Sequence, residues 1–152
     1  MEPDWLDESE LKTWEGFLAA GTMVNRLVEQ QLKQDAGLSH PQYEVLVRLS
    51  NAPEGELRMT ELAGVALTSK SGLSYQVTQL EKAGLVRRRS CPTDDRGVVA
   101  GLTDLGWVKL RAAAPGHLAM VREVFFDGLT KAQLEGLADG IGALVGRLRD
   151  EG

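Results

Sequence analysis

The segment from Arg58 to Leu102 constrains the fold most, because two short helical patterns are followed there by two short strand patterns. A first helix is expected over RMTELAGVAL, and a second begins after a turn at the N-cap candidate Thr68. Gly84 ends the second helix, and LVRRRS and VVAGL then read as strands on either side of the turn-forming CPTDDRG. Two helices joined by a tight turn and followed by a hairpin form a winged helix-turn-helix layout.

The second helix of this segment has two distinct faces. Leu73, Val77 and Leu80 form its apolar face, whereas hydroxyl and amide groups dominate the other. In a helix-turn-helix the second helix lies in the DNA major groove, where such groups can contact phosphates and base edges. The alternative is an ordinary exposed helix face. The residues of this helix predicted to contact DNA are Thr68, Ser69, Lys70, Ser71, Ser74, Tyr75, Gln76 and Gln79.

Positive charge gathers in the same segment, although the formal net charge of the chain is -5. Residues 58–96 hold seven basic residues against four acidic ones, and a local positive field of this kind can attract a polyanion. A solvated surface loop would explain the charge alone equally well. The expected hairpin favours a DNA-binding wing, whose arginines contact phosphates or enter the minor groove. The wing residues predicted to meet DNA are Arg88, Arg89, Asp94 and Arg96.

Helical patterns flank this segment on both sides. Apolar residues recur at three- and four-residue steps over residues 10–34, Gly37 ends that pattern, and Ser39 opens the next helix. A long helix is expected from Thr103 to about Gly128, and a capping box formed by Thr130 and Gln133 begins the last one. These flanking helices carry more apolar residues than a single core-facing stripe requires, so we expect a second copy of the chain to cover them.

The expected fold is therefore mostly α with a small β-hairpin wing, in one domain over residues 1–152. Its winged-helix core covers residues 39–102, and its dimerisation helices cover residues 10–34 and 103–150. Hydrophobic residues make up 43% of the chain and charged residues 26%, which is typical of a soluble globular protein. The single cysteine, the acidic start of the chain and the lack of an apolar run of about 20 residues lead us to expect a cytoplasmic protein without a membrane partner.

The stretch from Arg58 to Gly106 resembles the MarR (multiple antibiotic resistance regulator) family of bacterial transcription factors. The resemblance rests on the GLVxR segment, on Asp94 and Arg96 at the expected wing tip, and on the LTxxG segment that contains Thr103. It implies a homodimer built by the N- and C-terminal helices, with its two winged-helix lobes reaching adjacent major grooves of double-stranded DNA.

Two departures from the family pattern concern the expected DNA contacts. Asp95 stands at a wing-tip position that is often basic in relatives, and Tyr75 and Gln79 stand where arginines are common. The base preference of this chain is therefore expected to differ from that of better-known relatives.

The resemblance also implies a small aromatic or anionic effector, because relatives commonly bind aromatic acids between the dimerisation helices and the DNA-binding part. The rings and cations suited to such a guest are Trp14, Arg26, His40, Tyr43 and Trp107. The alternatives are that these rings fill the core, and that release from DNA depends on oxidation of Cys91 beside the arginines.

Residues for enzyme chemistry are lacking in the sequence. It contains no nucleophile elbow, no metal-ligand spacing and no glycine-rich phosphate loop, and its 17 glycines are scattered. His40 and His117 lie far apart without Cys or Asp partners at ligand spacing, so no metal and no cofactor are expected. We expect a DNA-binding repressor that recognises a pseudo-palindromic operator and is released by its effector. A winged-helix module that binds another protein is the remaining alternative.

Overall fold

The computed structural model describes residues 1–66, 69–91 and 94–151 of the chain. These residues pack into two compact units, residues 1–117 and 118–152, and each unit is described by itself. The single domain expected over residues 1–152 therefore stays a prediction. Within the described ranges, none of the helices combines the length and the apolar character needed to cross a membrane.

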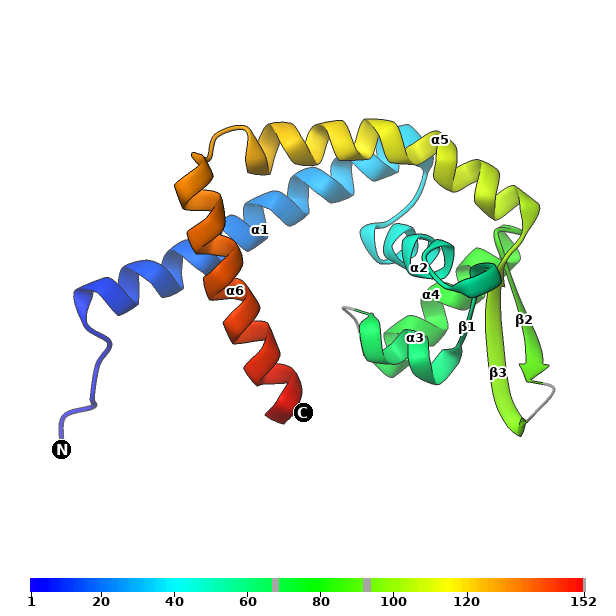
Figure 1. Cartoon of the computed structure of the whole chain (residues 1–152), viewed down its shortest axis with the longest axis horizontal. Helices are drawn as coiled ribbons and strands as arrows, with labels where there is room; N and C mark the ends of the chain where they lie inside the picture. Colours follow the sequence, from blue (N-terminus) through cyan, green and yellow to red (C-terminus); the bar gives the residue numbers. More distant parts are fainter. Residues whose placement is uncertain (67–68, 92–93, 152) are drawn as a thin grey trace. The chain divides into compact units, whose positions relative to one another are not determined.

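Two capped helices begin the first unit, α1 (Glu8–Ala36) and α2 (His40–Ser50), as Figure 1 shows. Gly37 ends α1 in the left-handed conformation, with a φ of 66° that favours glycine. The Oγ of Ser39 accepts a hydrogen bond from the N–H of Gln42 at 3.2 Å, and the Gln42 side chain accepts the N–H of Ser39 at 3.0 Å. The predicted end of the first helix and start of the second are thereby confirmed.

The rest of the first unit is a helix pair and a small sheet. The sheet is antiparallel with the strand order β1-β3-β2, so that β3 is its central strand. The predicted hairpin is present, but the prediction missed β1, which pairs Leu57 with Ala100. Three residues are too few to show the alternation that reveals a strand. The elements are a 3-10 turn (Pro53–Gly55), β1 (Glu56–Arg58), α3 (Met59–Val65), α4 (Lys70–Lys82), β2 (Val86–Cys91) and β3 (Asp94–Leu102).

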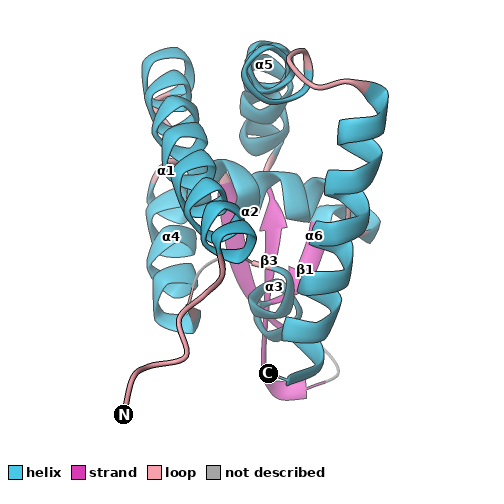
Figure 2. Cartoon of the chain, turned by 90° about the vertical axis from the view of Figure 1, so that its left-hand side faces the viewer, coloured by secondary structure: helices cyan, strands magenta, loops and turns pink. Residues whose placement is uncertain are grey.

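Leucines from three helices form the centre of the first unit. Leu46, Leu62 and Val77 are completely buried, and Leu73 and Leu80 are 1% exposed. The predicted apolar face of α4 is therefore confirmed. Helices α2, α3 and α4 all contact the sheet, and Figure 2 shows the strands lying beside them.

The first turn of α5 (Asp104–Val121) is fixed against the turn between α4 and β2. The Thr103 hydroxyl donates to the carbonyl oxygen of Gly84 at 2.6 Å and accepts the N–H of Gly106 at 3.0 Å. A Cβ at Gly106 would lie 2.1 Å from the carbonyl oxygen of Leu85. Only glycine allows so close an approach of α5 to this turn.

The second unit consists of the end of α5, a π-helical segment (Arg122–Phe126) and α6 (Lys131–Glu151). The predicted capping box is confirmed, because Thr130 and Gln133 exchange hydrogen bonds of 2.9 and 3.1 Å. The predicted helix up to about Gly128 is present, but its last turn, Arg122–Phe126, is π-helical rather than α-helical. A hydrophobicity pattern does not distinguish a π-helical turn from an α-helical one. None of the described α6 residues is buried.

Candidate nucleic-acid interface

Helix α4 presents a small polar face beside its N-terminus. Ser69 is the N-cap, and its Oγ accepts the N–H of Gly72 at 3.1 Å and lies 3.3 Å from the Oγ of Ser71. Ser74 is exposed, and Tyr75 is 61% exposed. Because Leu73, Val77 and Leu80 face the core, these hydroxyl groups face outwards together, in the arrangement predicted for base and phosphate contacts.

The other residues predicted on this helix are placed differently. Gln76 and Gln79 are half-buried, and Gln79 lines a shallow cavity formed with the α1–α2 junction and α5. Lys70 is the first residue of α4, but its side chain lies outside the described parts, as does the whole of Thr68. The cap that the structure describes is therefore Ser69, one residue after the predicted one.

The wing is formed by β2 and β3, which pair from Val86–Leu102 to Ser90–Val98 before a shift in register. Asp94 and Arg96 belong to β3, as predicted for the wing, but their side chains lie outside the described parts. Their predicted contacts with DNA stay predictions.

Two wing arginines have carboxylate partners within the chain. Arg88 donates to Glu81 of α4 at 3.2 Å, and Arg89 forms an ion pair with Glu56 of β1. The Glu56 side chain passes over Gly101 of the central strand. A Cβ at Gly101 would lie 3.0 Å from the Cγ of Glu56. Both arginines are thus partly neutralised, which reduces the positive field inferred from the charge count.

The sequence interpretation missed Glu81, Thr78 and Glu56 as partners of the wing arginines, and it left out Arg87. Strand alternation was a usable signal, because Val86 is buried and Arg88 must share its side of β2. Arg88 therefore points toward α4, while Arg87 is exposed on the other side. The partner of Arg89 could not be found in this way, since β1 itself was missed.

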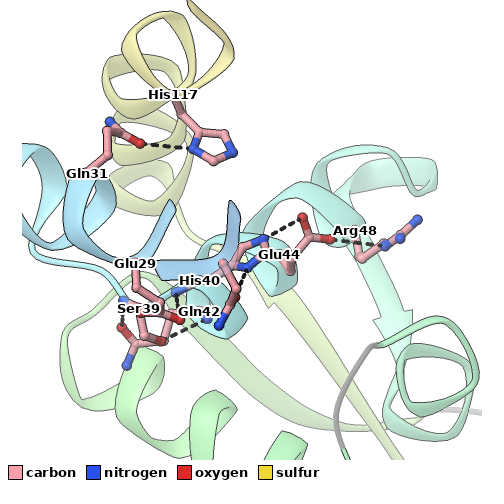
Figure 3. Close-up of polar contacts among 9 residues, drawn as sticks. Glu29, Gln31, Ser39, His40, Gln42, Glu44, Arg48 and His117 are labelled. Atoms are coloured by element: carbon pink, nitrogen blue, oxygen red, sulfur yellow. Dashed lines mark hydrogen bonds and ion pairs between the residues drawn. The ribbon is translucent and has the colours of Figure 1, made fainter. Parts of the chain in front are cut away.

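A second polar cluster lies between α1 and α2 and is drawn in Figure 3. Glu29 of α1 accepts the backbone N–H of His40 at 3.1 Å, and the His40 ring lies 3.3 Å from the Asn25 Oδ1. His40 also lies 3.6 Å from Glu44, which in turn lies 3.7 Å from the Nε of Arg48. The hydrogen bond from His40 is the main cause that lowers the pKa of Glu44 below its ordinary value.

This cluster borders a cavity of about 250 Å³. Leu62 and Ala66 of α3 form an apolar part of its wall, and the buried Nε of Arg48 has no hydrogen-bond acceptor among the described residues. The cavity therefore combines a cation, carboxylates and an apolar wall.

The five residues predicted to hold an effector are not brought together. Only His40 lines the cavity. Trp14 is 53% exposed and stacks on Phe17 of its own helix, while Trp107 packs against Gly55. Within the described residues, the predicted rings lie on different elements and do not converge, so the prediction that they hold an effector stays a prediction.

The remaining two predicted residues differ in exposure. Arg26 is exposed, whereas Tyr43 is buried against the His117 ring, with 4.4 Å between the ring centroids. Burial raises the pKa of Tyr43 and lowers that of His117, whose Nδ1 lies 3.0 Å from Gln31. These two rings therefore form part of the core between α1, α2 and α5.

Cys91 is 8% exposed at the end of β2 and belongs to no disulfide. An oxidant reaches a buried thiol slowly, so this position gives little support to the redox alternative. Within the described residues, no group of three or more His, Cys, Asp or Glu side chains could hold a metal ion.

Comparison with solved structures relates this arrangement to known proteins. Sco3205 of Streptomyces coelicolor, described as a MarR family transcriptional regulator in complex with DNA, is 43% identical to this chain. The match covers 95% of this chain and 90% of that one, with a TM-score of 0.90. The chain belongs to the MarR family.

Further comparisons agree with this assignment. The MarR family model matches residues 38–98, which cover most of the winged-helix core. AbsC, another MarR family transcriptional regulator of Streptomyces coelicolor, is 37% identical over 97% of this chain and 99% of its own, with a TM-score of 0.92. The HTH-type transcriptional repressor YetL of Bacillus subtilis is 26% identical over 78% of this chain and 71% of its own. The MarR resemblance seen in the sequence is confirmed, and the mostly α winged-helix fold with it.

Proposed function

We propose that the chain is a homodimeric transcriptional repressor that binds a pseudo-palindromic operator in double-stranded DNA in the bacterial cytoplasm. The observation that carries this proposal is the exposed hydroxyl face of α4, from Ser69 to Tyr75, beside a two-stranded wing. The DNA complex of Sco3205 and the repressor name of YetL support it.

Exposed apolar stripes on the terminal helices support the homodimer. On α1, Leu11, Phe17 and Leu27 are 43–55% exposed. On α6, Ile141 and Leu148 are 40% and 58% exposed. Apolar stripes of this size are covered in stable proteins, and a two-fold partner would cover both at once.

Selection of bound sequences from random duplex DNA tests the proposed function. We expect a pseudo-palindrome with half-sites about 10 base pairs apart, and an affinity that falls steeply with salt. Arg96→Ala is expected to weaken specific binding by roughly 1–3 kcal/mol if this residue enters the minor groove. Lys131→Ala, an exposed charge on α6, is the matched control.

Two outcomes would contradict the proposal. Absence of sequence preference in the selected pool would contradict the proposed operator. A chain that is monomeric at micromolar concentration would contradict the proposed homodimer. Binding that does not depend on salt would favour the alternative of a protein-interaction module, because phosphate contacts release counterions.

We further propose that a small aromatic or anionic effector releases the repressor from DNA. The cavity between α1, α2 and α3 supports this, because Arg48 can face an anion while Leu62 and Ala66 face an apolar ring. An effector releases DNA only if it prefers the form of the dimer that binds DNA poorly. A hundredfold preference supplies about 2.7 kcal/mol, which is enough to empty an operator bound with modest excess.

Titration of aromatic carboxylates and phenols against the protein–operator complex tests the effector. Arg48→Gln is expected to raise the concentration needed for release, whereas Lys33→Gln, at an exposed position of α1 that does not line the cavity, is the control and should leave it unchanged. If no compound releases DNA while peroxide does so in the wild type and not in Cys91→Ser, the redox alternative replaces the effector.

A further inference from the structure

The edge of the wing is tied to α4 through a single carboxylate. Glu81 accepts the backbone N–H of Arg88 at 3.1 Å with one oxygen, and the Arg88 Nη2 at 3.2 Å with the other. One side chain of α4 thus holds both the backbone and the guanidinium of one residue of β2. Charge-assisted hydrogen bonds of this kind are stronger than neutral ones.

The same guanidinium also reaches the middle of α4. The Arg88 Nη2 donates to the Oγ1 of Thr78 at 2.9 Å, and the Thr78 hydroxyl donates to the carbonyl oxygen of Ser74 at 2.9 Å. Ser74 lies on the exposed hydroxyl face of α4. The wing strand is therefore connected by hydrogen bonds to the backbone of the face that would meet DNA.

The position of β2 in the sheet explains why this carboxylate is needed. With the strand order β1-β3-β2, β2 is an edge strand, and every second N–H of an edge strand points away from the sheet. The N–H of Arg88 is one of these, and Glu81 satisfies it. Val86 lies on the same side of β2 as Arg88 and is buried, so the Arg88 side chain starts next to the core and extends along α4.

We propose that Arg88 is a positioning residue, which holds the wing at a fixed distance from α4 through Glu81 and Thr78 instead of contacting a phosphate. This inference deepens the proposed function and rests on it, because the distance between the wing and α4 affects DNA binding only if both contact the same duplex. We refer to Thr78, Glu81 and Arg88 together as the wing clamp.

Glu81→Gln distinguishes the wing clamp from a direct phosphate contact by the sign of its effect. If Arg88 contacted a phosphate, Glu81 would compete for it, and removal of the carboxylate charge would strengthen DNA binding. If the wing clamp positions the wing, the same substitution removes the charge-assisted bonds and weakens DNA binding. The side chains are nearly equal in size, so the fold should be retained.

The experiment measures the affinity of the full-length chain for its selected duplex over a series of salt concentrations. We expect Glu81→Gln, Arg88→Gln and Arg88→Lys each to weaken DNA binding by about tenfold. The first removes the carboxylate charge that pairs with Arg88, and the other two remove the planar guanidinium group. The dependence of binding on salt should keep the wild-type slope, whereas loss of a phosphate contact lowers this slope by about 1. The double variant Glu81→Gln/Arg88→Gln should bind no worse than Glu81→Gln or Arg88→Gln alone, because both substitutions remove the same interaction.

Arg87→Gln is the matched control, because it removes the same charge from the neighbouring exposed position without touching the wing clamp. Any loss of affinity in this variant should come with a lower salt slope. Tighter binding by Glu81→Gln, or a slope lowered by about 1 in Arg88→Gln, would overturn the proposal.

A measurement without DNA separates failure of the wing clamp from failure of the proposed function. Hydrogen bonds from Arg88 lower the pKa of the Glu81 carboxyl, so its carbon-detected NMR titration should shift to higher pH in Arg88→Gln. Exchange of the Arg88 amide should be faster in Glu81→Gln than in the wild type. If both quantities stay unchanged, the wing clamp is absent, whether or not the chain binds DNA.

Discussion

The winged-helix core and the terminal helices carry the same kind of apolar pattern but bury it to very different degrees. In the core, Leu46 and Leu62 are completely buried. In α6, the residues of an equally regular stripe are 37–58% exposed. Helix α1 combines both situations, since Val28 and Leu32 near its end are buried and the stripe before them is exposed.

This difference shows that an amphipathic pattern predicts a buried face without naming the surface that buries it. The leucines of α2, α3 and α4 face one another and the sheet within about sixty residues of chain. The stripes of α1 and α6 need a surface that lies outside their own compact unit. The core should therefore depend on intramolecular packing, and the terminal helices on association.

The largest expected effect is the loss of a core leucine. Leu46→Ala should lower the free energy of unfolding by roughly 2–5 kcal/mol, because it removes a completely buried side chain and leaves a cavity. Leu148→Ala on α6, where the side chain is 58% exposed within the chain, should instead weaken association of two chains and change the unfolding of the separated chain by only about 0.5 kcal/mol or less. Urea denaturation of both variants checks this, and equal losses would remove the distinction between the two regions.

A slightly smaller effect is expected where α5 meets the core. Gly106→Ala should destabilise the protein by roughly 1–3 kcal/mol, since the new methyl group would clash with the Leu85 carbonyl. Gly64→Ala is the matched control, because nothing lies within 4 Å of its Cβ position and alanine favours the helix. Thermal unfolding measures both, and an unchanged Gly106→Ala would mean that α5 is held less closely than the structure describes.

Substitutions in the exposed stripe of α1 should change the dimerisation constant. Phe17→Ala removes a 55% exposed ring from the stripe of α1 and is expected to weaken dimerisation by more than about 1 kcal/mol, or at least fivefold in Kd. Glu15→Gln changes a neighbouring exposed position and should leave the Kd unchanged. Sedimentation equilibrium measures the two constants, and identical values for both variants would exclude this stripe from the interface.

The smallest expected effect is a pH dependence at His117, which is 6% exposed. Burial, with a smaller contribution from His40, keeps the pKa of His117 below 6.5. Between its folded pKa and its unfolded value of about 6.5, the unfolded chain binds more protons, so the free energy of unfolding falls as the pH falls. Above about pH 6.5 this contribution is fully present.

Denaturation at pH values between about 5 and 7 checks this behaviour. His117→Gln should flatten the decline, because the substituted side chain does not titrate. Glu44 and Glu81 have lowered pKa values and lose their contribution only below about pH 4.5, so they do not obscure this range. A decline identical to that of the wild type would mean that His117 titrates normally.

Local signals in the sequence were sufficient for most of the fold. The helix start at Ser39 and the capping box of Thr130 and Gln133 depend on residues within one helical turn, and both were predicted and are present. The apolar face of α4 was predicted from its period alone. Such features involve contacts within one or two turns of a helix, which the sequence displays directly.

The candidate site was less predictable, because its arrangement depends on contacts between distant residues. The ion pair between Arg89 and Glu56 spans two strands, one of which was too short to recognise. The sequence could not show whether the predicted effector residues converge, because an aromatic side chain does not reveal which face of a helix meets which neighbour. The charge count was correct, but it could not reveal that Arg88 and Arg89 have acidic partners in the fold.

The junction between α1 and α2 has a consequence for how the length of this chain can vary. Gly37 closes one helix, Ser39 caps the next, and Leu38 between them is 4% exposed, so each of the three residues has a separate task. One inserted residue would separate the two caps or expose Leu38, and one deletion would remove a cap. Insertions and deletions should therefore be tolerated at the exposed residues 127–128, after the π-helical segment, and rejected at 37–39.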